Sequence, residues 1–203
     1  PFTFVASANT IARLGATPVF ADIDPESFNL SPESVAQAIT PRTKAIVAVH
    51  LFGRSADMTG LSALASRHDL PLVEDCAQAI GAEWGGRRVG TLSTLGCFSF
   101  FPAKNLGCLG DGGLVTTQDP KLAQQIRTLR AHGASARYMY DAIGGNFRLD
   151  ALQAAILRVK LPELEGWTET RQDNALAYQE KLRARGLDAR IVVPQSGPGR
   201  HVW

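Results

Sequence analysis

Lys104 lies between an apolar segment and a glycine-rich segment, a position that suits a partly desolvated amine. Phe98-Ser-Phe-Phe-Pro102 precedes it, and Asn-Leu-Gly107 follows it. A lysine amine is a nucleophile only after it loses its proton, and burial or neighbouring cations lower its pKa toward that state. Such an amine condenses with an aldehyde to form a Schiff base. The alternative is a lysine whose stem lies along a strand end while its ammonium group reaches water.

Asp75 ends the run Leu70-Pro-Leu-Val-Glu-Asp75, which is typical of a buried strand. Ligands of open α/β sheets bind beyond the carboxyl ends of the strands. A carboxylate there can hold the proton of a pyridinium ring, so Lys104 and Asp75 together predict a pyridoxal 5'-phosphate (PLP) site. Gln78 could donate an amide hydrogen bond to the same ligand. The alternatives are a helix N-cap for Asp75 and a solvent-facing side chain for Gln78.

Four further polar side chains could reach a ligand from strand ends or turns. Ser99, five residues before Lys104, could bond a phosphate, or it is a small buried hydroxyl bonded to the backbone. His50 ends another strand and could face the substrate, or it is a satisfied core histidine. Asn146 and Arg148 lie in a glycine-led turn before a helix, where they could bind an anion or act as simple caps.

Other site classes have weaker support. The glycine-rich segment 107–113 lacks the Gly-Lys-Ser/Thr ending of a P-loop, so we interpret it as a tight turn into a strand. No Gly-x-Gly-x-x-Gly follows the first strand, which disfavours a Rossmann-type nucleotide binder. The histidines and cysteines lack metal-ligand spacing, and we expect no metal.

The elements that must position these residues form an alternating pattern. We expect strands at 18–22, 44–50, 70–75, 96–101 and 113–117, and helices at 7–14, 31–38, 58–68 and 120–131. Strands that alternate with helices of this size predict an α/β fold with a mostly parallel sheet flanked by helices.

Beyond Asp150 the pattern is helical, with helices at 151–159 and 163–185 and then a turn into a strand at 186–193. We therefore expect a PLP-binding large domain at 1–162 and, at 163–203, a linking helix and the start of a smaller C-terminal domain. Because the chain starts at Pro1 and stops at Trp203 directly after a loop, we expect a fragment that lacks parts of both domains.

Composition excludes several classes of protein. The chain has 203 residues, of which 45% are hydrophobic, and a net charge of +2 with mixed charges, so no nucleic-acid partner is expected. No apolar run approaches the roughly 20 residues that span a bilayer, and no signal-peptide pattern begins the chain. Three cysteines without Cys-x-x-Cys spacing indicate reduced thiols and a cytoplasmic protein.

Five segments, in order, resemble the sugar-aminotransferase family called DegT/DnrJ/EryC1/StrS. They are Pro1-Phe-Thr-Phe-Val-Ala-Ser-Ala-Asn9, Val49-His-Leu-Phe-Gly-Arg-Ser-Ala-Asp-Met58, Glu74-Asp-Cys-Ala-Gln-Ala-Ile-Gly-Ala82, Phe98-Ser-Phe-Phe-Pro-Ala-Lys-Asn-Leu-Gly107 and Gly145-Asn-Phe-Arg-Leu-Asp-Ala-Leu-Gln-Ala154. The resemblance covers essentially the whole chain. It implies a PLP-dependent enzyme with the aspartate-aminotransferase-type fold. The predicted large domain of this chain would then be the large domain of a fold-type-I transferase.

The resemblance also implies roles for individual residues. Lys104 would form the Schiff base with PLP, Asp75 would pair with the pyridine nitrogen and Gln78 would lie near the ring hydroxyl. Two further cofactor residues follow from it: Ser99 would bind the phosphate, and Phe4 would stack on the ring.

A homodimer with shared active sites is implied as well, because Asn146 would approach the phosphate of the partner subunit's cofactor. The implied reaction transfers an amino group from glutamate to a keto nucleotide sugar, in the biosynthesis of cell-surface polysaccharides or secondary-metabolite sugars. The run Asn105-Leu-Gly-Cys-Leu-Gly-Asp-Gly-Gly113 resembles the subgroup that aminates 3-keto sugars.

The chain departs from the family pattern at Gly110-Asp-Gly-Gly113, where many members have Gly-Glu-Gly-Gly. The family's phosphate-binding Gly-Thr turn would precede Pro1.

Two alternative functions remain. Relatives that are PLP-dependent sugar dehydratases have a histidine at the position of Lys104, which disfavours that activity. The second alternative is a non-catalytic regulator of the same fold that binds PLP or a sugar.

Overall fold

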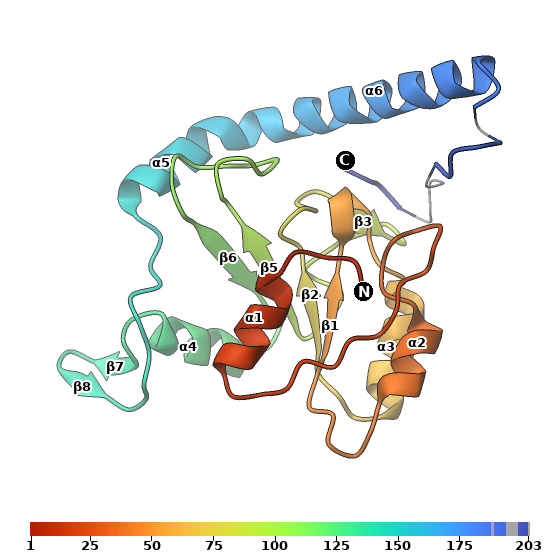
Figure 1. The fold of residues 1–203 in the computed structure, drawn as a ribbon. Coiled ribbons are helices and arrows are strands. Elements are labelled where there is room, and N and C mark those ends of the chain that lie inside the picture. Colours follow the sequence, from red (N-terminus) through yellow and green to blue (C-terminus); the bar gives the residue numbers. More distant parts are fainter. Residues whose placement is uncertain (188, 194–198, 203) are drawn as a thin grey trace.

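The computed structural model describes residues 1–187, 189–193 and 199–202 (Figure 1). At its centre is a four-stranded sheet with the strand order β1-β2-β5-β6, in which the first three strands are parallel and the last is antiparallel to its neighbour. The strands are β1 (Ile46–Val49), β2 (Leu72–Asp75), β5 (Leu95–Ser99) and β6 (Gly113–Thr116). The predicted α/β fold with a mostly parallel sheet is therefore confirmed.

Asp75 and Ser99 point to the same face of this sheet. The register pairs Val49 with Asp75 and Asp75 with Cys97. Successive side chains of a strand alternate between the two faces, so Asp75, Cys97 and Ser99 share one face and Glu74 points to the other. We call these the Asp75 face and the Glu74 face.

Two helices, α2 (Pro32–Ala38) and α3 (Met58–Arg67), cover the Glu74 face. Their apolar side chains form one core with β1 and β2, and its buried members are Val35, Ile46, Ala48, Ala56, Met58, Leu61, Leu64, Ala65 and Leu72. The Asp75 face is contacted by α1 (Ala6–Arg13), whose Ser7 is hydrogen-bonded to Asp75. The two faces thus differ, because one carries the core and the other carries polar groups at the strand ends.

Local sequence explains where the helices begin. Ser31, Asp57 and Asp119 each accept backbone N–H groups of the first turn, at the starts of α2, α3 and α4 (Pro120–Leu129). Proline follows two of these caps, at the first helical position, where its missing N–H has no cost. All four helices predicted in this part of the chain are present.

Short elements connect the main ones. They are the 3₁₀ turn η1 (Leu51–Gly53), the hairpin of β3 (Glu83–Trp84) and β4 (Arg87–Arg88), and the hairpin of β7 (Ala134–Ala136) and β8 (Met139–Tyr140).

The C-terminal part is helical, as predicted. It consists of α5 (Ala151–Lys160), the 3₁₀ turn η2 (Leu161–Glu163) and the long α6 (Leu164–Ala184), which lies outside the sheet in Figure 1. Leu157 of α5 packs with Phe100, Leu106 and Cys108, which follow β5. This cluster joins the helical part to the segment that contains Lys104. The division into domains at 1–162 and 163–203 stays a prediction.

Two predicted strands are wrong. At 18–22 the chain is in no strand, and nearby only an isolated bridge joins Ile23 to Leu30. At 186–193 the described residues form turns and bends, while Asp188 lies outside the described residues. Both segments have apolar strand-like sequences. A strand also needs a hydrogen-bonding neighbour, and among the described residues neither segment has one.

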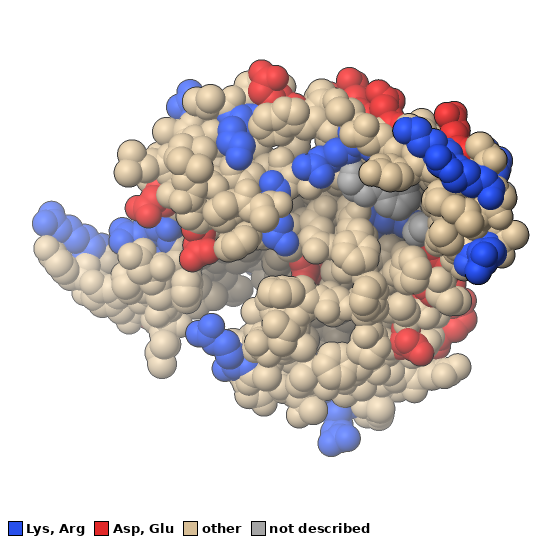
Figure 2. All heavy atoms as spheres, turned by 45° about the horizontal axis from the view of Figure 1, so that its top comes forward, with Lys and Arg blue, Asp and Glu red and all other residues tan. Residues whose placement is uncertain are grey.

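The surface is mixed in charge. Figure 2 shows Lys and Arg side chains separated by acidic and uncharged ones on the face in view, in keeping with the net charge of +2. Among the described residues, no helix is long and apolar enough to cross a membrane.

Candidate cofactor site

Asp75, at the carboxyl end of β2, is held at both of its oxygens. Its Oδ2 accepts the Ser7 hydroxyl at 2.7 Å, and its Oδ1 accepts the Ala77 backbone N–H at 3.1 Å. The second bond resembles the helix N-cap that the sequence left open as an alternative, but residues 76–82 form turns and no helix, so that alternative is wrong. A carboxylate has about four acceptor positions, so two remain for a ligand. The side chain is half-buried.

Gln78 lies in the turn after β2, and its orientation is set by the backbone. Its Oε1 accepts the Phe52 N–H at 2.8 Å. Because the oxygen is engaged, the amide NH₂ is the group free to donate to a ligand. Phe52 adopts a φ of 53°, a conformation that is uncommon for a residue with a side chain. Its ring packs edge-on against Phe2, with the centroids 5.9 Å apart.

Ser99 and Lys104 lie at the end of β5 and in the turn that follows. The Ser99 Oγ accepts the Phe101 N–H at 3.3 Å, which leaves the hydroxyl proton to be donated. The Lys104 N–H is bonded to the Phe101 carbonyl at 2.9 Å, so the lysine closes a tight turn. Its side chain is half-buried, and among the described residues its ammonium group makes no hydrogen bond.

The loop after Lys104 is fastened from several sides. Asn105 donates its side-chain amide to the Val202 carbonyl at 2.6 Å, and the Leu109 N–H donates to Gln153 Oε1 of α5 at 2.8 Å. Lys160, also on α5, donates to the Gly107 carbonyl. A lysine in so constrained a turn has its backbone placed before any ligand binds. Such preorganisation reduces the entropic cost of binding.

The Glu74 face has a different polar centre. Glu74 is fully buried and accepts four hydrogen bonds: from His50 Nε2 at 3.0 Å, Gly90 N–H at 2.7 Å, Leu92 N–H at 2.9 Å and the Ser93 hydroxyl at 2.9 Å. Burial alone would raise the pKa of the Glu74 carboxyl, but the hydrogen bonds, led by those from His50 and Gly90, hold that pKa below its ordinary value.

His50 is enclosed in this centre. Its Nδ1 accepts the Ala56 N–H at 3.0 Å, so the ring proton is on Nε2 and is donated to Glu74. The side chain is fully buried. With both ring nitrogens used, the geometry favours the core-histidine alternative over contact with substrate. The Cys76 thiol lies within 4.8 Å of these two groups, but burial raises its pKa, and His50 and Glu74 are already hydrogen-bonded to each other.

Three other predicted residues have exposed side chains. Phe4, just before α1, is 67% exposed. Asn146 and Arg148 follow the β7–β8 hairpin, where the Arg148 Nε donates to Asn146 Oδ1 at 2.8 Å. Both are exposed, and neither contacts Asp75. Their predicted roles toward cofactor and substrate stay predictions.

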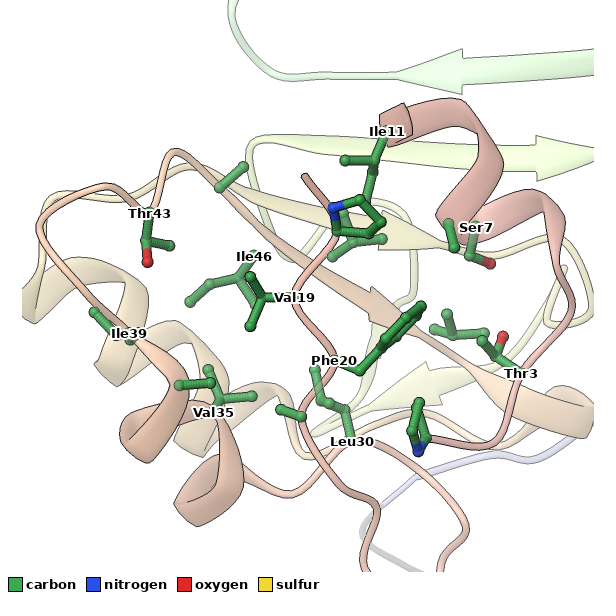
Figure 3. A pocket seen from close by; sticks show the side chains of 18 of the residues that line it. Thr3, Ser7, Ile11, Val19, Phe20, Leu30, Val35, Ile39, Thr43 and Ile46 are labelled. Atoms are coloured by element: carbon green, nitrogen blue, oxygen red, sulfur yellow. The ribbon is translucent and has the colours of Figure 1, made fainter. Parts of the chain in front are cut away.

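An apolar pocket of about 740 Å³ lies beside the cluster, at the free edge of β1. Figure 3 shows Ile11 and Ser7 of α1 on one side of it, Val35 of α2 and Ile39 directly after α2 on the other, and Phe20 between them. Ser7 is at its rim. Neither Lys104 nor the other predicted cofactor residues line this pocket, and Ser7, which is hydrogen-bonded to Asp75, lies between the pocket and the strand-end site.

The groups at the strand ends fit PLP. Its aldehyde needs an amine, its ring nitrogen a carboxylate, and its ring hydroxyl and phosphate need donors. The chain offers the Lys104 amine, the Asp75 carboxylate with two open positions, the Gln78 NH₂ and the Ser99 hydroxyl. Each comes from the end of β2 or β5, where parallel sheets bind ligands.

The DegT/DnrJ/EryC1/StrS aminotransferase family model matches residues 1–203. The chain belongs to this family. The family is PLP-dependent, which agrees with the donor set at the strand ends.

Individual relatives are close in sequence and structure. A "Pleiotropic regulatory protein" of Geobacillus stearothermophilus is 50% identical over 98% of this chain and 54% of its own. A UDP-N-acetyl-3-dehydro-alpha-D-glucosamine 3-aminotransferase of Acidithiobacillus ferrooxidans is 48% identical over 98% and 53%. The crystal structure of a family aminotransferase from Brucella abortus superimposes with a TM-score of 0.93 at 39% identity, covering 100% of this chain and 55% of that one. The chain spans about half the length of the relatives it matches.

Three residues with clear structural roles were not among the predicted ones. Ser7 contacts Asp75 from 68 residues away, a separation that no local pattern reveals. The backbone of Phe52 orients Gln78, and backbone contacts leave little trace in residue type. Glu74 did carry a signal, because a charged residue at an inward position of a buried strand requires partners.

Proposed function

We propose that the protein containing this chain is a PLP-dependent aminotransferase that moves an amino group from glutamate to a keto nucleotide sugar. Bound PLP supplies a ring that withdraws electrons from the carbon next to the reacting nitrogen. The observation that carries the proposal is the half-buried Lys104, free of internal hydrogen bonds among the described residues, in a loop fixed from α5 beside the strand ends that carry Asp75 and Ser99.

Each group has a distinct task in this proposal. Lys104 holds the cofactor through its amine and, once released, moves a proton as general base and then as general acid. Asp75 holds the proton of the ring nitrogen. The Gln78 NH₂ donates to the ring hydroxyl, the Ser99 hydroxyl donates to the phosphate, and Phe4 covers one side of the ring.

The relatives' names support the substrate class. The Acidithiobacillus protein is named as a 3-aminotransferase of a UDP-linked 3-dehydro sugar. A 3-keto nucleotide sugar is therefore the substrate that we favour for this chain. The product would be an amino sugar linked to a nucleotide. It would serve the biosynthesis of cell-surface polysaccharides or secondary-metabolite sugars, in the cytoplasm.

A homodimer completes the proposal. Large apolar side chains around the β7–β8 hairpin are exposed, namely Tyr138, Met139, Tyr140, Ile143 and Phe147. Exposed apolar groups that gather in this way are typical of interaction surfaces. Asn146 lies within the same stretch and would reach the cofactor of the partner subunit. Sedimentation of the whole protein and of Ile143→Glu tests this, because a charge in the interface would shift the dimer toward monomer.

Replacement of Lys104 tests the function. Lys104→Ala, made in the whole protein and purified with PLP, should lose the visible absorbance band of the bound cofactor and its amino-transfer activity. Lys121→Ala on the exposed surface of α4 is the matched control and should keep both. An unchanged spectrum in Lys104→Ala would contradict the proposal.

A non-catalytic regulator is the second candidate, and the name of the Geobacillus relative favours it. Such a protein would bind PLP or a sugar without turnover. Glutamate added to the purified protein distinguishes the two, because an aminotransferase converts its bound cofactor to the amino form and loses the visible band. A regulator would keep that band unchanged.

A further inference from the structure

The contact between Ser7 and Asp75 joins two distant parts of the chain at the strand-end site. The hydroxyl of Ser7, in the first turn of α1, donates to Asp75 Oδ2 at 2.7 Å. Both side chains are half-buried. A hydrogen bond to an ionised carboxylate is among the stronger kinds in proteins, and partial burial strengthens it further.

This bond sets the plane of the carboxylate. The terminal torsion of an aspartate side chain is broad, so one anchor leaves the carboxylate free to turn about it. Asp75 has an anchor on each oxygen, Ser7 on Oδ2 and the Ala77 N–H on Oδ1. Two anchors fix the plane and leave one acceptor position on each oxygen open to a ligand.

The same bond places the segment before α1. The Ser7 N–H donates to the Phe4 carbonyl at 3.3 Å, so Phe4 and Ser7 belong to one turn. Fastening Ser7 to Asp75 therefore also holds Phe4 relative to the end of β2. Asp75 and Phe4, the two groups proposed to contact the ring, are thus linked through Ser7, whose hydroxyl bonds to Asp75 and whose backbone N–H bonds to Phe4.

We propose that Ser7 is a positioning residue, which aims the Asp75 carboxylate at the ring nitrogen of PLP and keeps Phe4 beside it. The inference rests on the proposed function, because it requires PLP to bind at Asp75. Thr10, one turn later on α1, gives the comparison. Among the described residues, its hydroxyl bonds to the carbonyls of Ala6 and Ser7 and not to Asp75.

The test is PLP binding to the apoprotein, measured for the whole protein by titration of its tryptophan fluorescence. Ser7→Ala should raise the dissociation constant of PLP about tenfold, the effect expected from loss of one hydrogen bond to a charged group. Ser7→Thr keeps the hydroxyl and should bind within about twofold of the unmodified protein. Thr10→Ala should also bind within about twofold.

A double-mutant cycle separates positioning from general stability. If Ser7 acts through Asp75, then Ser7→Ala should add little in a protein that already carries Asp75→Asn. Ring protonation gives a second readout: with PLP labelled with ¹⁵N at its ring nitrogen, Ser7→Ala should move the NMR signal toward the unprotonated form.

The outcomes distinguish this inference from the proposed function. If Asp75→Asn leaves PLP binding unchanged, the site itself is wrong. If Asp75→Asn weakens binding but Ser7→Ala does not, or if the two effects simply add, only the positioning role of Ser7 is overturned. Equal losses in Ser7→Ala and Thr10→Ala would also overturn it, because they would point to α1 stability alone.

Discussion

Glu74 and Asp75 are consecutive carboxylates with opposite environments. Glu74 points into the core, where four donors use its acceptor positions. Asp75 points to the other face, is half-buried and accepts two hydrogen bonds. The two carboxylates thus differ in the acceptor positions left open, and open positions are what the proposed contact of Asp75 with the cofactor requires.

The largest expected effect concerns stability. Glu74→Ala leaves the His50 ring, the Gly90 and Leu92 N–H groups and the Ser93 hydroxyl without their acceptor. Buried donors left in this way should lower the free energy of unfolding by about 3–5 kcal/mol. Urea denaturation followed by circular dichroism measures it. If the free energy of unfolding falls no further in Glu74→Ala than in Asp75→Asn, the contrast between Glu74 and Asp75 is wrong.

Asp75→Asn should show the reverse pattern. The amide has the same shape but cannot hold the ring proton, so turnover should fall about a hundredfold, as when one preorganised electrostatic group is removed. The free energy of unfolding should change by less than about 1 kcal/mol. Steady-state kinetics and denaturation of the same preparation give both values. Asp119→Asn at the cap of α4 is the control and should leave turnover unchanged.

The pH dependence of stability sharpens the comparison further. Hydrogen bonds hold the pKa of Glu74 in the folded protein below its ordinary value, despite burial. Its contribution is therefore present above the unfolded-state pKa and is lost as pH falls through the folded-state pKa. Denaturation between about pH 6 and about pH 3 should show this loss, and the slope should be smaller in Glu74→Gln. An identical slope in the variant would contradict the assignment.

The smallest effect is at Cys97, which shares a face with Asp75. Burial, and then the Asp75 charge, raises the pKa of its thiol. In Asp75→Asn that charge is absent, so more thiolate should form and alkylation by iodoacetamide should be faster by about twofold to fivefold. Mass spectrometry of labelled peptides follows Cys97 separately from Cys76. Unchanged labelling would show that the Asp75 charge does not act on this thiol.

Local pattern predicted most of the fold. Strands β1, β2, β5 and β6 and the capped helices follow from apolar runs, from Ser31, Asp57 and Asp119 and from the prolines behind two of them. It was wrong at 18–22 and 186–193, because apolar residues make a strand possible and only a neighbouring strand makes it form. The apolar run that predicts β2 ends at Asp75, so the position of Asp75 at a strand end was predictable as well.

The sequence alone therefore determined the residue types of the site, their order along the chain and the family to which it belongs. Tertiary structure decided which of two adjacent carboxylates is saturated, that both His50 nitrogens are used, and that Ser7 meets Asp75. These outcomes depend on contacts between segments far apart in the chain. Residue type limits how many hydrogen bonds a group can make, but the packing of helices and strands selects its partners.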